Sequence, residues 1–304
     1  MHVETVLVTE SWLRREGLPD SWDADRPMLR AWFLCVPLPS CVSVRLGSVQ
    51  ASLVEELESR GFDQAPVEVP GSPLGWRLVA TSKLRALLDR GDALSDDASH
   101  FLQDDILELA CADSSNTVDL GSILRLMRQR RAAVLYDERA TGSVTQRRIF
   151  GLLTRSDFNR RAVRVAIFDR LASLERSMAS IVTRHYPDDP NWLALLAKRR
   201  RMELEVYASH SKTSGDDLEL IEAVTLADLL SIYGKSDEIR VKLGLASKSA
   251  FKKSYGKLAG IRNRVMHPVR PLVSRERGLG DVADSVDAID DLTRRTDQAE
   301  RLQA

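Results

Sequence analysis

The chain has 304 residues, of which 43% are hydrophobic, which is enough for two domains with ordinary cores rather than a disordered chain. Basic and acidic residues both number 44, so the net charge is zero, which excludes a protein held to polyanions by long-range attraction. No apolar run reaches the roughly 18 residues of a membrane-spanning helix, and the N-terminus lacks a signal-peptide layout. The three cysteines are scattered, without a CxxC pair. We therefore expect a cytoplasmic protein with no membrane partner, disulfide framework or metal site.

The first 44 residues contain two strand-like runs, at 3–8 and 32–36, separated from each other and from the next segment by prolines and a charged loop. We predict a strand-containing extension over residues 1–44 that covers an edge of the next domain. No functional residue is assigned to it.

Residues 45–162 contain one supersecondary unit twice. The first copy predicts, in order, a helix at 52–57 ending at Gly61, a strand at 64–67, a turn at 71–73, a strand at 77–80 and a helix at 82–88 closed by Gly91. The second copy predicts a helix at 120–127, a strand at 132–136, a polar loop at 137–147 and a strand ending at Thr154. A repeated unit of this kind buries its sheet against its own copy, so the two copies are expected to form one paired module.

From residue 163 onward, helical signals replace strand signals. An antiparallel bundle is expected over residues 163–304, with helices at 163–181, 192–207, 217–233, 247–266 and 282–302. The apolar positions of the first helix, which predict its buried stripe, are Val165, Ile167, Phe168, Leu171, Leu174, Met178 and Ile181. No glycine or proline lies between residues 158 and 164, so the connection into the first of these helices is expected to be stiff. The chain is thus predicted to combine an α+β N-terminal part with an all-α C-terminal part.

The segment Gly-Leu-Leu-Thr-Arg-Ser-Asp at 151–157 joins the end of a strand to the start of a helix. The hydroxyl of Thr154 and the first amides of a helix together suit a phosphate group. The carboxylate of Asp157 suits two vicinal ribose hydroxyls. The same residues also fit a simple helix cap, in which Thr154 or Ser156 accepts hydrogen bonds from helix amides and no ligand is involved.

This segment resembles the second half of a CBS domain, whose nucleotide-contact pattern is a glycine, two apolar residues, Thr or Ser, two variable residues and Asp. The resemblance implies tandem CBS domains of the βαββα type over residues 45–162. It also implies a site in the second copy in which Thr154 and Asp157 contact the ligand and Val134 and Tyr136 wall the adenine pocket.

The first copy departs from the CBS pattern, because Arg77, Ala80 and Lys83 stand where the pattern has glycine, threonine and aspartate. The resemblance therefore implies one intact ribose site, and Lys83 either contacts phosphate or has no role. Family ligands contain adenosine: AMP, ATP, S-adenosylmethionine or an adenine dinucleotide. The sequence does not choose among them, and the module can also serve as a scaffold without a ligand.

A second informative segment ends the helix expected at 247–266, where the sequence reads Arg-Asn-Arg-Val-Met-His-Pro from residue 262. The inward stripe of this helix is predicted to consist of Leu258, Ile261 and Val265, which stand at helical spacing. Asn263 and His267 are four residues apart and share a face, with Arg262 beside them. Pro268 disfavours the helical conformation at His267, so the histidine should close the helix.

These three side chains suit phosphoryl chemistry. Histidine transfers protons near neutral pH, and arginine holds a phosphoryl group with paired donors. The string Arg-Asn-x-x-x-His-Pro, late in a helix of an all-helical domain, resembles the signature of HEPN domains, which include metal-independent endoribonucleases and toxins. The resemblance implies that Arg262 holds the scissile phosphate, that His267 transfers the proton and that Asn263 orients the site, within a homodimer.

Other interpretations of this segment remain open. Some HEPN domains keep the motif but serve as dimerisation or nucleotide-binding modules. A histidine at a helix C-terminus can also simply satisfy backbone carbonyls. Short basic runs at 128–131, 160–161 and 198–201 are candidate RNA contacts, but they also fit solvated helix faces.

Together these features predict an endoribonuclease of the stress-response or phage-defence type, with RNA as substrate, an adenine nucleotide as regulator and no required cofactor. The alternative is a non-catalytic, nucleotide-sensing dimeric regulator that docks on a partner protein. The RNA target, the ligand and the sign of regulation are not specified by the sequence.

Overall fold

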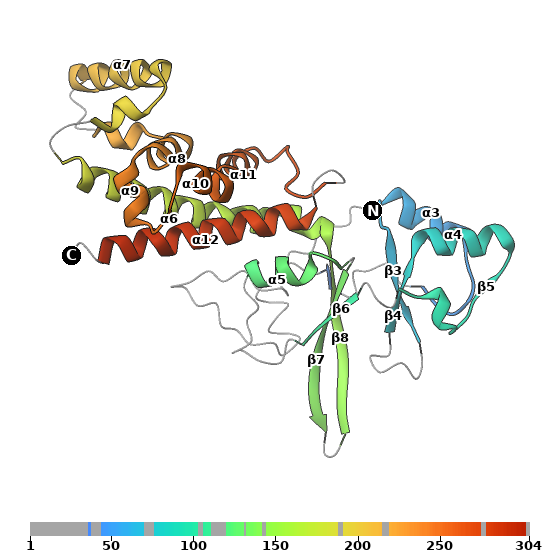
Figure 1. Cartoon of the computed structure of the whole chain (residues 1–304). Helices are drawn as coiled ribbons and strands as arrows, with labels where there is room; N and C mark the ends of the chain where they lie inside the picture. The colour runs from blue at the N-terminus through green and yellow to red at the C-terminus, as the bar shows by residue number, and fades with distance from the viewer. Residues whose placement is uncertain are drawn as a thin grey trace. The chain divides into compact units, whose positions relative to one another are not determined.

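The computed structural model describes residues 36–37, 44–69, 76–102, 106–110, 120–130, 132–141, 144–187, 191–214, 219–274 and 278–301. The fold is of mixed α and β type, and its C-terminal part is helical (Figure 1). The chain divides into two compact units, at residues 1–160 and 161–304. Within the described ranges, no helix has both the length and the apolar character needed to cross a membrane.

The first half of the N-terminal unit is built around an antiparallel hairpin. Strands β3 (Gln64–Glu68) and β4 (Trp76–Ala80) pair in register, and Val44 bridges Val67 in the parallel sense. Helix α3 (Ala51–Ser59) lies between Val44 and β3 in the chain, and α4 (Thr81–Arg90) follows β4. The short strands β2 (Gly47–Ser48) and β5 (Ala93–Leu94) pair with each other, and η2 (Ala98–His100) comes next.

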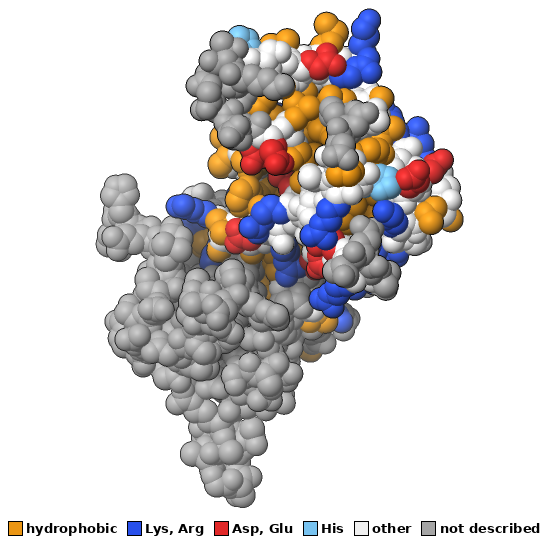
Figure 2. Space-filling model, turned by 90° about the vertical axis from the view of Figure 1, so that its left-hand side faces the viewer, with side chains coloured by type: hydrophobic (Ala, Val, Ile, Leu, Met, Phe, Trp, Pro, Cys, Tyr) orange, Lys and Arg blue, Asp and Glu red, His pale blue; other side chains and the backbone are white. Residues whose placement is uncertain are grey.

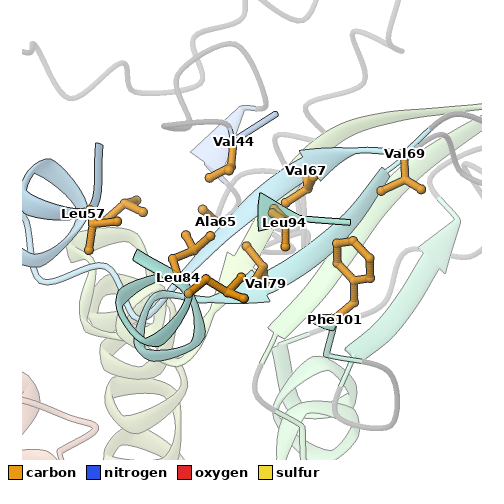
Figure 3. Packing of buried hydrophobic residues seen from close by; sticks show 11 residues of the cluster. Val44, Leu57, Ala65, Val67, Val69, Val79, Leu84, Leu94 and Phe101 are labelled. Atoms are coloured by element: carbon orange, nitrogen blue, oxygen red, sulfur yellow. The ribbon is translucent and has the colours of Figure 1, made fainter. Parts of the chain in front are cut away.

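Apolar side chains from these elements form a closed core (Figure 3). The picture shows the side chains of the two helices and the hairpin pointing toward one another. The cluster comprises Val44, Val54, Leu57, Ala65, Val67, Val69, Val79, Leu84, Leu87, Leu94 and Phe101, all at most 7% exposed. Gly91 adopts φ 69°, a left-handed conformation that ends α4 where the sequence predicted it to close.

The second half contains three strands, with a helix between the first two. Strand β6 (Ile106–Ala110) pairs in parallel with β7 (Ala132–Thr141), and α5 (Leu120–Met127) lies between them in the chain. Strand β8 (Val144–Thr154) returns antiparallel to β7 and leads into η3 (Arg155–Asn159). The sheet order is β1-β8-β7-β6, where β1 (Val36–Pro37) is the edge strand.

The helix predicted at 120–127 is confirmed, and the strand-like extension contributes β1 within its described part. Its other run, at 3–8, and the turn at 71–73 lie outside the described residues.

The polar loop predicted at 137–147 is wrong, because β7 and β8 continue as a paired ribbon to Thr141 and from Val144. The register places Asp137 opposite Arg148 and Glu138 opposite Arg147. A strand is usually recognised in a sequence by the alternation of apolar and polar residues, which arises when one face of the sheet is buried. A pair of strands made mostly of polar residues lacks this pattern and therefore resembles a loop in the sequence.

The C-terminal unit is a bundle organised on two long helices, α6 (Arg161–His185) and α12 (Leu279–Arg301), which lie side by side (Figure 1). Shorter elements connect them, in the order η4 (Asn191–Leu195), α7 (Lys198–Ser214), η5 (Leu220–Ala223), α8 (Leu226–Lys235), α9 (Asp237–Lys242), α10 (Lys248–Tyr255) and α11 (Leu258–Met266). Arg160 precedes α6 with φ −63° and ψ 153°, so one extended residue separates η3 from α6 and the two do not form one continuous helix.

Several predicted helices are shorter than the sequence indicated. In the segment predicted at 217–233, the described part begins at residue 219 and contains η5, and the α-helix begins only at Leu226. Thr225 and Asp228 form a capping box that fixes this helix start. The segment 247–266 is two helices, α10 and α11, separated at Gly256. A Cβ atom on that glycine would lie 2.6 Å from the carbonyl oxygen of Lys252, so the turn needs a residue without a side chain. Helix α9 was not predicted, and the segment 192–207 is η4 followed by α7.

The bundle core follows the apolar stripe of α6 with two exceptions. Ile167, Leu171, Leu174, Met178 and Ile181 are buried as predicted, and all are at most 2% exposed. Val165 and Phe168, which the sequence placed on the same stripe, are 47% and 44% exposed. Both lie near the N-terminal end of α6, on faces that the other helices of this unit do not cover.

Candidate functional site

Helix α11 turns its apolar side inward and its polar side outward. Leu258, Ile261 and Val265 are buried, which confirms the predicted stripe. Because this stripe fixes the rotation of the helix, Arg262 is half-buried at the edge of the bundle and Asn263 is exposed. The helix thus presents the polar residues of the motif at the surface.

Helix α11 ends before Pro268, as the sequence predicted. Met266 is the last helical residue, and His267 has φ −112° and ψ 93°, an extended conformation. The His267 amide donates to the Arg264 carbonyl at 3.3 Å, and the His267 carbonyl accepts from the Arg270 amide at 2.9 Å. The backbone of the histidine is therefore held on both sides, while its side chain is exposed.

Arg262 is oriented by an acidic residue of another helix. Its Nε lies 3.6 Å from Oε1 of Glu175 on α6, beyond hydrogen-bond distance but within the range of an ion pair. Oε1 of Glu175 is buried and has no hydrogen-bond partner among the residues that the structure describes. A buried carboxylate oxygen of this kind depends on a nearby cation, so the contact holds the guanidinium against α6.

Arg164 on α6 reaches the same end of α11. Its Nη1 donates to the Arg264 carbonyl at 2.6 Å and its Nη2 to the Arg270 carbonyl at 2.5 Å. The side chain is 8% exposed, and burial lowers the pKa of its guanidinium from the usual value. The sequence offered no signal for Arg164 or Glu175, because both lie on a helix far upstream of the motif.

The structure therefore brings Arg262, Asn263 and His267 to one end of α11, with two partners from α6 behind them. Among the described contacts, none joins the three side chains directly to one another. An exposed imidazole at this helix end can transfer a proton. A guanidinium anchored by a carboxylate can hold a phosphoryl group that approaches from solvent.

The second predicted site lies at the end of β8. Oδ2 of Asp157 accepts from the amide of Thr154 at 2.7 Å and from its hydroxyl at 2.8 Å, forming a capping box that starts η3. Oδ1 of Asp157 pairs with Arg160 at 2.7 Å. Burial raises the pKa of Asp157, although Arg160 and the hydrogen bonds from Thr154 act to lower it.

This arrangement is the helix cap that the sequence allowed as an alternative to a ligand site. Both carboxylate oxygens of Asp157 are engaged inside the chain, and the residue is 5% exposed. A ribose would therefore have to displace Arg160 or Thr154 from it. Val134 pairs with Leu152 in the sheet and Tyr136 with Ile149, but their side chains lie outside what the structure describes.

The basic run at 198–201 is largely neutralised within the C-terminal unit. Arg199 pairs with Glu203, and Arg200 pairs with Asp228 at 2.9 Å and donates to the Ala223 carbonyl. The face in Figure 2 likewise carries Lys and Arg side chains interspersed with Asp and Glu. These contacts fit a solvated helix face better than a nucleic-acid patch.

No protein-family model and no curated protein matches this sequence.

Proposed function

We propose that the C-terminal unit is a metal-independent endoribonuclease whose site lies at the end of α11, and that the N-terminal unit senses an adenine nucleotide. The observation that carries the proposal is the exposed His267 just past the end of α11, the helix that also carries Arg262 and its contact with Glu175. The likeness of the Arg-Asn-x-x-x-His-Pro string to HEPN domains supports the same assignment.

In the proposed reaction, the RNA 2′-hydroxyl attacks the adjacent phosphorus and the bond to the 5′-oxygen breaks. His267 takes up or delivers one of the two protons that move, one leaving the 2′-hydroxyl and one reaching the departing 5′-oxygen. Arg262 holds the non-bridging oxygens as their charge grows, and Asn263 orients the phosphate. The products are a 2′,3′-cyclic phosphate and a 5′-hydroxyl.

A second copy of the chain completes the proposed site, because two proton transfers need two groups and each chain brings one such histidine. Met266 and Val269 flank His267 in the chain and are 42% and 92% exposed. Apolar side chains this exposed suit a surface covered on association. We propose a homodimer in which the two α11 ends face each other.

The proposed regulator binds at the Thr154–Asp157 loop. The likeness of residues 151–157 to a CBS domain supports this, as does the recurring order of strand, helix, parallel strand and antiparallel strand. Binding would exchange the contacts of Asp157 with Arg160 and Thr154 for contacts with the ribose, which changes the hydrogen bonds at the start of η3.

The function is tested by incubating the purified chain with mixed tRNA and mRNA in EDTA, and by analysing the ends of any fragments. Cleavage that yields 2′,3′-cyclic phosphate and 5′-hydroxyl ends is expected. Intact RNA, or fragments with 5′-phosphate ends, would overturn the proposal.

The alternative is a non-catalytic regulator that docks on a partner protein. The exposure of Val269 favours it, since an apolar side chain next to the motif fits a protein contact as well as an RNA site. Under this alternative, RNA stays intact and substitution at Val269 disrupts complex formation.

A further inference from the structure

One buried guanidinium fixes both ends of the segment that carries the candidate catalytic histidine. The two carbonyls that Arg164 binds belong to Arg264 and Arg270, three residues before and three residues after His267. The segment is also tied internally, by the His267 amide to the Arg264 carbonyl and by the Arg270 amide to the His267 carbonyl. The side chain of Arg164 thus bridges the two ends of the turn at residues 264–270, and His267 lies at the midpoint of this turn.

The contact serves more than the stability of α11. The last carbonyls of a helix have no partner within it, so a cation at this end is favourable. Within the part of the chain that the structure describes, however, both acceptors of Arg164 are neutral carbonyls rather than carboxylates. A buried cation that has only neutral acceptors is costly to keep. A planar guanidinium can span two acceptors at a fixed separation, which the compact ammonium of a lysine cannot do.

We propose that Arg164 is a positioning residue for His267, an inference that rests on the proposed ribonuclease function. It does not contact the substrate, because it lies buried behind the turn. By fixing the Arg264 and Arg270 carbonyls it sets where the imidazole stands relative to Arg262. Losing it should let the turn move, which lowers the catalytic rate while RNA binding is retained.

The test compares Arg164→Lys and Arg164→Ala with Arg170→Ala in the full-length chain. Arg170 lies on the same helix and pairs with Asp290 at 2.6 Å, so its loss removes an α6 arginine without touching the turn. Arg164→Lys keeps the positive charge and decides the question if Arg164→Ala does not fold.

Two readouts are measured, steady-state cleavage of RNA and hydrogen exchange of the His267 and Arg270 amides. For Arg164→Lys we expect kcat to fall by roughly 10- to 100-fold with KM within about twofold, and both amides to exchange faster. Arg170→Ala should match wild type in both readouts.

Faster exchange with unchanged kcat would overturn the positioning role, and unchanged exchange would show that Arg164 does not fix the turn. A fall in kcat with a matching rise in KM would point to a contact with RNA instead. If wild type does not cleave RNA, the proposed function fails and the catalytic role of Arg164 fails with it. The exchange data then report only on the structure of the turn, which keeps the two failures distinct.

Discussion

Nε of Arg262 on α11 lies 3.6 Å from a buried carboxylate oxygen of Glu175 on α6, which accepts no hydrogen bond from any described residue. The pair links the candidate phosphate-binding residue to the longest helix of the bundle. Both side chains remain about one-third exposed, at 35% and 31%, so an ion pair of this kind contributes about 1 kcal/mol or less to stability. Its consequence is geometric, because it selects one orientation of the guanidinium.

Glu175→Gln is expected to leave the fold intact and to lower cleavage. Without the carboxylate charge, Arg262 loses its fixed orientation, and we expect kcat/KM to fall by roughly tenfold. Asp290→Asn is the matched control, since it breaks an ion pair between α6 and α12 away from the site. Equal activity of the two variants would show that Glu175 does not orient Arg262.

Arg262→Lys is expected to reduce cleavage by about 100-fold or more, because lysine cannot reproduce paired donors on a phosphate in the transition state. The measurement is single-turnover cleavage at saturating RNA, with circular dichroism as the check on folding. A variant with wild-type activity would remove the arginine clamp from the mechanism.

The chain is expected to be a dimer at micromolar concentration by light scattering. Val269→Asp places a charge on the proposed contact and should raise the dimer dissociation constant by at least about tenfold, or about 1.4 kcal/mol. Val241→Asp is the control, because Val241 on α9 is also highly exposed, at 74%. A monomeric wild type, or equal weakening by both substitutions, would count against the interface at α11.

The contact between α10 and α12 predicts the pH range over which the helical unit is most stable. The Tyr255 hydroxyl donates to Oδ2 of Asp291 at 2.5 Å, and Arg295 donates to the same oxygen at 2.9 Å. Burial acts to raise the pKa of Asp291, but the hydrogen bonds from Tyr255 and Arg295 together lower it. Burial, aided by the hydrogen bond to Asp291, raises the pKa of Tyr255 to about 12.

The pKa shifts of Asp291 and Tyr255 determine how the stability of the helical unit changes with pH. Because the pKa of Asp291 is lowered in the folded state, its carboxylate stabilises the fold at pH values above 3.8, the pKa of the unfolded chain. This stabilisation is lost as the pH falls through the pKa of the folded state. A phenol with a raised pKa stabilises the fold below 10.0, and this is lost as the pH rises toward 12. Melting temperatures should therefore fall at both extremes, and Tyr255→Phe should flatten the alkaline limb. An unchanged alkaline limb in Tyr255→Phe would contradict this account.

An adenine nucleotide is expected to bind at Asp157 and to change cleavage in the helical unit. Arg161, the first residue of α6, follows Asp157 by four residues, and Arg164 lies in the first turn of that helix. The single extended residue at Arg160 makes this connection less stiff than the sequence predicted, so coupling requires the ligand to prefer one arrangement of the dimer. A coupling of about 1–3 kcal/mol corresponds to a five- to 150-fold change in activity.

Calorimetry and cleavage assays on wild type, Asp157→Ala and Asp97→Ala test this coupling. Asp97 caps η2 in the first copy through the Ser99 amide at 2.9 Å, so its substitution controls for the loss of a cap. If Asp157→Ala binds nucleotide as well as wild type does, the ribose assignment is wrong. If ligand binds wild type but leaves cleavage unchanged, the N-terminal unit is a scaffold.

Local signals in the sequence account for much of the fold. The glycine at 91, the proline at 268 and the apolar stripe of α11 each act within a few residues, and each predicted the observed structure. The polar ribbon of β7 and β8 was missed because its stability depends on pairing across the sheet. The exposure of Phe168 could not be read from helical spacing, which cannot tell which apolar faces are covered.

The candidate site likewise combines residues that the sequence predicted with residues that it did not predict. The motif placed Arg262, Asn263 and His267 at one helix end because they are close in the sequence. Arg164 and Glu175 were not predicted because they approach from a helix that meets α11 only in the folded bundle. Side chains that position a site through tertiary contacts carry no spacing pattern of their own.

The central claim is tested most directly by cleavage of mixed tRNA and mRNA in EDTA by wild type and by His267→Ala, with His210→Ala as the control. Both histidines are exposed, so both variants should unfold within about 0.5 kcal/mol of wild type. The account predicts that His267→Ala slows cleavage by roughly 100-fold or more, while His210→Ala cuts like wild type. A folded His267→Ala variant that cuts as fast as wild type would contradict it.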